Sequence, residues 1–402
     1  MSMHFHQRRF FAYLSGAPNL HTLSSVSSHS HTLVTTDRCV SLLSYGDSGY
    51  SLHKLEVDAL RTGKADVVAA AAIERPETCQ SRVAVAYAVG DALFLQVLAH
   101  HHGSIGNGDD AEASGCGTFQ LEAAPTCMFS AQAAGPNGDV FYGVMVCCTD
   151  SMLAFGYIEN EKEASTTGSA TVCTRLNNDQ FAAFFPELST FTYTILAVDI
   201  YTSPGKDQGW VAFGCADGLV RVFHGSMRRG CLGGPFQTKD LQLNGPVTGV
   251  ALFPKQKTAP NNSTSTWCCN LLVTCAIGQA VVYEDLYNTS TEDENSEVLV
   301  DSDTFDSIFA GITADIDLDG EVELLLGTDS QKWQRLSRSQ WDLETFGAIY
   351  SLLWRDINHD GVPELLIASS TGIYVYEADP AFVINKVEHV LAALHTSSTT
   401  TK

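Results

Sequence analysis

The sequence predicts an all-β fold: a seven-bladed β-propeller followed by a short C-terminal helix. The first observation behind this prediction is a repeat, because "DIDLDGEVELLL" from Asp315 recurs as "DINHDGVPELLI" from Asp356 with the same order of residue types. The second is a hairpin signal that returns along the chain. The third is length, since 402 residues leave room for about seven four-stranded units of about 40 to 50 residues each.

The hairpin signal consists of an apolar strand, a tight turn with glycine or a small polar residue, and a second strand rich in Val, Tyr and Phe. It occurs as "CVSLLSYGDSGYSLHKL" from Cys39, "VFYGVMVCCTDSMLAFGYI" from Val140, "GWVAFGCADGLVRVFHG" from Gly209, "NLLVTCAIGQAVVYEDL" from Asn270 and "PELLIASSTGIYVYE" from Pro363. A four-stranded unit cannot bury both of its faces alone, so we expect such units to stack around an axis.

We expect residues 1–378 to form one propeller, with strands of the N-terminus helping to close the ring. A helical pattern is found only near the end, in "AFVINKVEHVLAALH" from Ala381 to His395. Residues 379–402 are therefore expected to form a short helix and a disordered tail.

Composition limits the partners and the compartment. A net charge of −23 disfavours nucleic acid and anionic membrane surfaces. No apolar stretch approaches the length of a membrane span, and the run Phe10–Leu14 is too short for a signal-peptide core. The adjacent pairs Cys147–Cys148 and Cys268–Cys269 lie in strand-like runs, where neighbours face opposite ways, so buried free thiols are expected. These observations favour a cytoplasmic protein without membrane insertion.

The two acidic loops are the candidate sites. Each places oxygen-bearing side chains at positions 1, 3, 5 and 9 around a glycine at position 6: Asp315, Asp317, Asp319 and Glu323 in the first loop, and Asp356, Asn358, Asp360 and Glu364 in the second. An EF-hand is excluded, because position 12 is Leu326 or Ile367 instead of Glu. The pattern resembles the calcium loops of FG-GAP repeats in integrin-like propellers.

Two interpretations of these loops stay open. The oxygens can converge on Ca²⁺, and the first loop is the better candidate because Arg355 and His359 offset the charge of the second. Alternatively, the Asp and Asn side chains hold a tight turn by accepting backbone N–H groups, with no ion. In both interpretations Gly320 takes a positive φ.

No catalytic motif is found. The sequence lacks GxSxG and HExxH patterns, and the run His100–His102 is interpreted as part of a solvated loop. A hydrolase built on a propeller would need titratable residues that meet at the central channel.

The chain resembles the kaptin family from Phe181 to Glu377. The most specific part is "AVVYEDL" from Ala280 followed by "DTFDSI" from Asp303 and the first acidic loop. This resemblance implies a non-enzymatic subunit of the KICSTOR complex, which recruits the GATOR complex to the lysosome surface and restrains TOR signalling when nutrients are scarce. It also implies as partners a second FG-GAP propeller subunit and a large scaffold subunit, together with an association with actin.

The alternative function is that of an integrin-alpha-like, calcium-binding adhesion propeller on the cell exterior. It predicts glycans at the sequons of Asn262 or Asn288.

Overall fold

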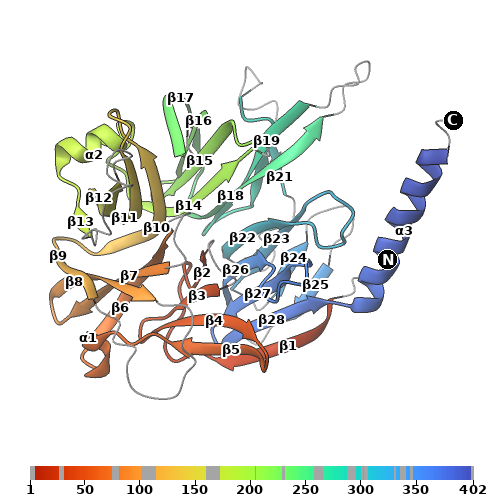
Figure 1. Ribbon diagram of the computed structural model, residues 1–402, viewed down its shortest axis with the longest axis horizontal. Coiled ribbons are helices and arrows are strands. Elements are labelled where there is room, and N and C mark those ends of the chain that lie inside the picture. Colours follow the sequence, from red (N-terminus) through yellow and green to blue (C-terminus); the bar gives the residue numbers. More distant parts are fainter. Residues whose placement is uncertain are drawn as a thin grey trace, which may run out of the picture.

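The fold is seen in a computed structural model, which describes residues 5–26, 31–74, 81–100, 115–159, 173–203, 205–228, 231–257, 266–287, 296–299, 302, 307–329, 332–335, 341–344 and 347–399. It is an all-β propeller with a short C-terminal helix, as the sequence predicts (Figure 1). The sequons of Asn262 and Asn288, residues 101–102 of the histidine run and the last residues of the expected tail lie outside the described part.

The described strands form seven four-stranded antiparallel sheets. The first three sheets are β2 (Leu23–Val26), β3 (His31–Thr35), β4 (Val40–Gly46) and β5 (Gly49–Lys54); β6 (Ala65–Ile73), β7 (Ser81–Val89), β8 (Ala92–His100) and β9 (Gly115–Leu121); and β10 (Pro125–Ala134), β11 (Val140–Cys148), β12 (Met152–Glu159) and β13 (Thr174–Arg175).

The next three sheets follow the same order. They are β14 (Ile195–Thr202), β15 (Gln208–Cys215), β16 (Leu219–Arg228) and β17 (Cys231–Gln242); β18 (Val247–Lys257), β19 (Thr266–Cys275), β20 (Val281–Tyr283) and β21 (Ser296–Val298); and β22 (Ile308–Ala314), β23 (Glu323–Thr328), β24 (Lys332–Arg335) and β25 (Trp341–Glu344).

The last sheet joins the two ends of the described chain. Its order is β1 (Phe5–Tyr13), β28 (Gly372–Ala378), β27 (Glu364–Ser369) and β26 (Ile349–Arg355). Phe11 pairs with Tyr374, and Tyr13 pairs with Gly372. The inner strands β2, β6, β10, β14, β18, β22 and β26 each contact the next, and β26 contacts β2. The sheets therefore close into a ring (Figure 1).

The core lies between neighbouring sheets rather than in one central body. Both faces of a sheet are covered by its neighbours, so β23 and β27 are buried at every position. Strand β6 reads "ADVVAAAAI", and its small side chains enter separate apolar clusters on its two faces. The cysteines whose burial the structure describes are buried free thiols, as predicted.

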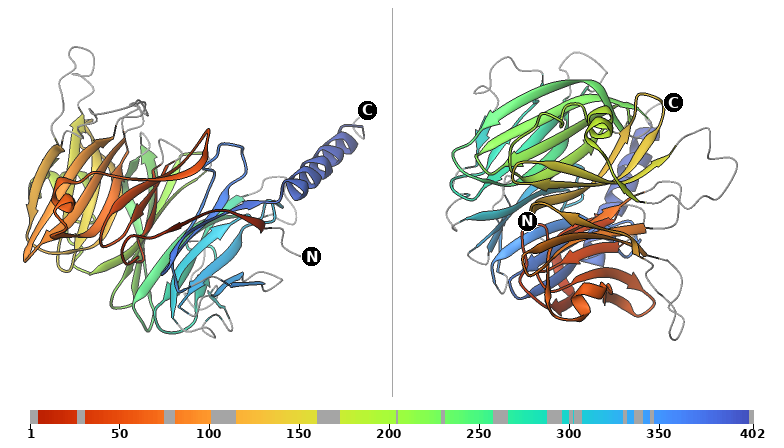
Figure 2. Two further views of the ribbon diagram at one scale, coloured as in Figure 1. Left: turned by 90° about the horizontal axis from the view of Figure 1, so that it is seen from below. Right: turned by 90° about the vertical axis from the view of Figure 1, so that its left-hand side faces the viewer.

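Three helices accompany the described strands: α1 (Asp58–Arg61), α2 (Asn178–Phe184) and α3 (Pro380–Thr399). Helix α2 begins with a capping box, in which the side chains of Asn177 and Gln180 each accept the other's backbone N–H. Helix α3 covers the predicted helical segment and projects away from the ring (Figure 2). Its exposed apolar side chains are Ile384, Val387, Val390 and Leu391. None of the described helices has the length and apolar character needed to cross a membrane.

Candidate functional site

The two acidic loops occupy equivalent places in adjacent sheets. One connects β22 to β23, and the other connects β26 to β27, so each follows the innermost strand of its sheet. The ninth residue of each pattern, Glu323 or Glu364, begins the second strand and is buried, with exposed fractions of 4% and 1%. The repeat in sequence is therefore a repeat in structure.

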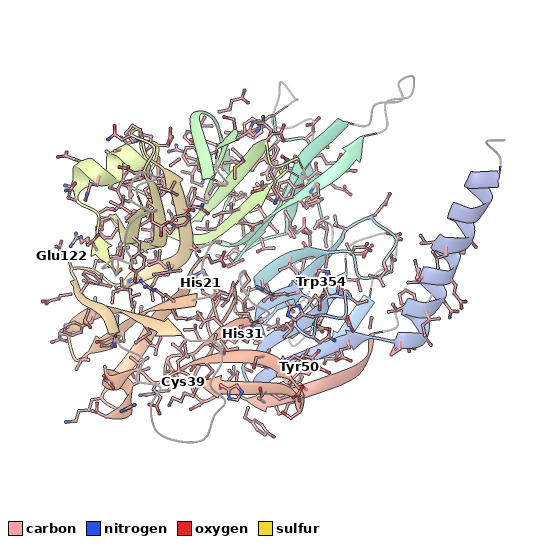
Figure 3. All side chains as sticks on the ribbon, viewed as in Figure 1. His21, His31, Cys39, Tyr50, Glu122 and Trp354 are labelled. Carbon is pink, nitrogen blue, oxygen red and sulfur yellow. The ribbon has the colours of Figure 1, made fainter. Side chains whose placement is uncertain are left out.

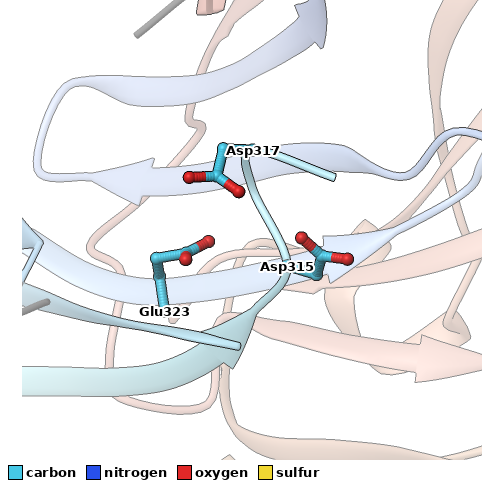
Figure 4. Close-up of side chains that lie close together, drawn as sticks. All are labelled: Asp315, Asp317 and Glu323. Carbon is cyan, nitrogen blue, oxygen red and sulfur yellow. The ribbon is translucent and has the colours of Figure 1, made fainter. Parts of the chain in front are cut away.

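Three carboxylates lie close together in the first turn (Figure 4), and two of them accept hydrogen bonds from its backbone. Asp315 accepts the N–H of Asp319 on Oδ1 at 3.0 Å and the N–H of Gly320 on Oδ2 at 2.9 Å. Glu323 Oε2 accepts the N–H of Ile316 at 2.8 Å. Gly320 has a φ of +90°, as the sequence predicts for the sixth position. These bonds are the ones that a turn without an ion would need.

The second turn has nearly the same bonds. Asp356 accepts the N–H of His359 at 2.7 Å and that of Gly361 at 3.0 Å. Glu364 Oε2 accepts the N–H of Ile357 at 2.7 Å. The position before the central Asp is left-handed in both turns, with φ of +55° at Leu318 and +61° at His359. The sequence does not predict the positive φ of Leu318, because leucine rarely adopts this conformation, whereas histidine adopts it more often.

Three carboxylates converge in each turn, and Asp319 of the first pattern is not among them. One oxygen each of Asp315, Asp317 and Glu323 lies within 4.8 Å of the other two, and the same holds for Asp356, Asp360 and Glu364. Among the described residues, these are the groups of Asp, Glu, His or Cys that meet in this way.

The fourth oxygen-bearing side chain of each pattern makes hydrogen bonds within its own turn. Asp319 Oδ1 accepts the N–H of Glu321 at 2.9 Å. Asn358 accepts the N–H of Asp360 at 2.9 Å, and its Nδ2 donates to Asp360 Oδ2 at 3.1 Å. Both side chains thus stabilise the tip of the turn.

Burial raises the pKa of one carboxylate in each turn. In the second turn, burial raises the pKa of Glu364 to about 7. The negative charges of Asp360 and Asp356 raise this pKa further, whereas the hydrogen bond from the N–H of Ile357 lowers it. Burial also raises the pKa of Asp315, against the hydrogen bonds from Gly320 and Asp319. A bound cation would compensate the negative charge of these buried carboxylates, whose oxygens are the ligands that Ca²⁺ prefers. Each carboxylate oxygen can accept an N–H and still bind an ion.

The fold and the two turns define the class of this chain: a β-propeller that carries acidic turns on adjacent sheets. A family model described as "KICSTOR complex protein kaptin" matches residues 171–388, more than half of the chain. The chain therefore belongs to the kaptin family.

One relative is similar to this chain in sequence, and two solved structures are similar to it in fold. The chain is 36% identical to the KICSTOR complex protein kaptin of Mus musculus over 149 residues, which make up 37% of this chain and 34% of the mouse protein. The match thus spans about a third of the relative's length. Two crystal structures of BBS1N in complex with ARL6DN, soaked with mercury or with lead, align with TM-scores of 0.51 at 12% identity. They cover 94% and 93% of this chain and 98% and 96% of theirs, and they show the fold alone.

Proposed function

We propose that this chain is a non-enzymatic scaffold and works as the kaptin subunit of a KICSTOR complex. The observation that carries the proposal is the family match over residues 171–388. In this proposal the chain contacts a second FG-GAP propeller subunit and a large scaffold subunit, and the assembly recruits the GATOR complex to the lysosome surface to restrain TOR signalling when nutrients are scarce. An association with actin filaments is part of the same proposal.

The fold supports a scaffold role. We count each four-stranded sheet as one blade, so that residues 1–378 form a single seven-bladed ring whose outer strands and loops are available to partners. Helix α3 adds a second surface, with apolar side chains that are exposed over two turns. The integrin-alpha-like alternative is not favoured, because the chain belongs to the kaptin family.

The test is affinity purification of tagged chain from cells with and without amino acids, followed by mass spectrometry. Recovery of a second propeller subunit and a large scaffold subunit, with lysosomal localisation by microscopy, would support the proposal. The proposal would be overturned if neither subunit were recovered, with or without amino acids. Cosedimentation of the purified chain with actin filaments tests the actin association separately.

We further propose that the first acidic turn binds Ca²⁺ through Asp315, Asp317 and Glu323. The support is the convergence of their oxygens, one from each carboxylate, within 4.8 Å of one another. The second turn, at Asp356, Asp360 and Glu364, is the weaker candidate, because the raised pKa of Glu364 makes a proton compete with the ion.

A further inference from the structure

Helix α3 exposes a stripe of apolar side chains to water. Ile384, Val387, Val390 and Leu391 have exposed fractions of 57%, 52%, 54% and 50%. Their spacing of three, four and seven residues places them on one face of the helix. In a heptad, Val387 and Val390 take the two seam positions a and d, and Ile384 and Leu391 both take the flanking position e. We call these four residues the α3 stripe.

No described element of the chain covers the α3 stripe. The helix follows β28 and projects away from the ring (Figure 2), and none of the described strands and helices makes an extensive contact with it. Its start is fixed, because Asp379 Oδ1 accepts the N–H of Ala381 at 2.9 Å. Valine and isoleucine favour a helix less than leucine or alanine, and most helices in proteins are stabilised by packing of their apolar face. The α3 stripe therefore needs a partner surface.

Charge distinguishes α3 from the rest of the chain. Residues 380–402 contain two lysines, one glutamate and no aspartate or arginine, which gives a formal charge of +1. Because the whole chain carries −23, the remaining residues carry −24. The segment that contains α3 is thus a place where two copies of this acidic chain can meet without opposing their carboxylates.

The base of α3 lies beside the second acidic turn. Near the end of β28, Tyr376 pairs with Leu365, the residue that follows Glu364. In an antiparallel pair of α3 helices, the positively charged segment of each copy runs toward the acidic base of the other. A parallel pair would instead bring two acidic rings together at the same end.

The length of α3 supports the antiparallel arrangement. The helix has 20 residues, so it is about 30 Å long. An antiparallel pair holds the two rings at opposite ends of this length, whereas charges are screened over about 8 Å at physiological salt. Repulsion between the rings is therefore weak in this arrangement.

The α3 stripe is complementary to itself in the antiparallel orientation. When Val387 of one helix lies opposite Val390 of the other, the two-fold axis repeats that contact on the other side of the centre. The same register brings Ile384 of each helix to the flank where Leu391 of the other lies. All four residues of the stripe thus find apolar partners, and Asn385 and His389 remain on the opposite face in water.

We propose that the α3 stripe binds the α3 stripe of a second copy of this chain, in an antiparallel helix pair that forms a homodimer with its rings at opposite ends. This inference does not depend on the KICSTOR assignment. Two paired helices of this length form a small interface, so we expect a dissociation constant on the order of micromolar.

The experiment is sedimentation equilibrium of the purified full chain from about 1 to about 100 µM, a range that brackets a micromolar equilibrium. The average mass should rise with concentration from that of a monomer toward twice that value. Val387→Asp should raise the dissociation constant at least about tenfold, because it places a charge at the centre of the seam.

The matched control is Asn385→Asp, which puts the same carboxylate on the same helix, on the face away from the α3 stripe. It should leave the dissociation constant unchanged, and circular dichroism verifies that both variants keep their helical content. A wild type that stays monomeric at about 100 µM, or a Val387→Asp variant that dimerises as well as the wild type, would overturn the proposal.

A pair of charged variants tests the orientation. Ile384→Glu and Leu391→Lys should each weaken the dimer, and a mixture of the two should form heterodimers, because residues 384 and 391 face each other only in the antiparallel pair. No gain in the mixture over either variant alone would contradict the antiparallel arrangement.

The homodimer and the KICSTOR assignment can fail separately. A chain that dimerises but recovers no complex subunits from cells would retain the helix pair and lose the assignment. A chain that stays monomeric but recovers those subunits, and loses them in Val387→Asp, would retain the assignment and give the α3 stripe to one of them instead of to a second copy.

Discussion

The hydroxyl of Tyr50 donates a hydrogen bond to Oε1 of Glu377 at 2.9 Å, between residues 327 positions apart. Tyr50 lies on β5 (Figure 3) and Glu377 lies on β28, so the bond joins the first sheet of the chain to the last. Burial raises the pKa of Tyr50 far above its usual value, the charges of Glu364 and Glu377 act in the same direction, and Asn358 opposes them. The contact between the first and last sheets thus lies next to the second acidic turn.

Tyr50→Phe should destabilise the propeller by about 1 kcal/mol, because it removes the bond to Glu377 and keeps the ring. Urea unfolding measures the change. Tyr45→Phe is the matched control: Tyr45 packs edge-on against Tyr50 at 4.9 Å and is 46% exposed, so loss of its hydroxyl should change little. Equal effects of the two variants would contradict a role for the hydrogen bond in ring closure.

Stability should fall as pH rises from about 4.5 to about 7 in the presence of a chelator. The pKa of Glu364 is 4.5 ordinarily and about 7 in the folded chain, so across this window the native state holds a proton that the unfolded state releases. The contribution is fully present below the lower value and is lost as pH passes the upper one, by about 1 to 3 kcal/mol. Urea unfolding at a series of pH values measures this slope.

Glu364→Gln should flatten that slope, since its amide oxygen can still accept the N–H of Ile357 and cannot titrate. Glu122→Gln is the control: it replaces an exposed carboxylate and should leave the pH dependence of stability unchanged. An unchanged slope in Glu364→Gln would show that other groups set the pH dependence.

Calcium should raise the melting temperature of the wild type and should fail to do so in Asp317→Asn, since that carboxylate belongs to the converging group of the first turn. Differential scanning calorimetry with and without CaCl₂ measures the shift. Asp319→Asn should retain the shift, because Asp319 lies outside the group and bonds Glu321. A wild type that does not respond to calcium would support a turn without an ion.

Gly320→Ala and Gly361→Ala should each cost about 1 to 2 kcal/mol, because both glycines have φ near +90°. A Cβ at either position would meet nothing within 4 Å, so the cost is one of backbone conformation alone. Gly46→Ala is the control, since its Cβ would also be unobstructed and its φ is not positive. Thermal unfolding of the three variants should therefore separate the two turn glycines from Gly46.

The sequence predicts local features well because they depend on neighbouring residues. The alternation of apolar residues and turns shows the hairpins, and the glycine at the sixth position of the acidic loops fixes the positive φ of Gly320. The pattern of Asp and Glu also shows which side chains meet in the first turn, with the exception of Asp319. Its local bond to Glu321 competes with convergence, and spacing alone does not tell the two outcomes apart.

Features that depend on distant residues are not predicted. Nothing near Tyr50 indicates a partner on β28, and nothing in β10 indicates that Phe129 and Ile200 line the same cavity. Such contacts are set by the angle and separation of stacked sheets, which result from the packing of the whole ring.

The pairing of β1 with β28 also bears on how the protein is made. Strand β1 is synthesised before the other strands of the ring and β28 after them, so the nascent polypeptide carries an unsatisfied edge until β28 has been made. Completion of the circle therefore waits for β28, and a chaperone that shields that edge would favour correct maturation over aggregation.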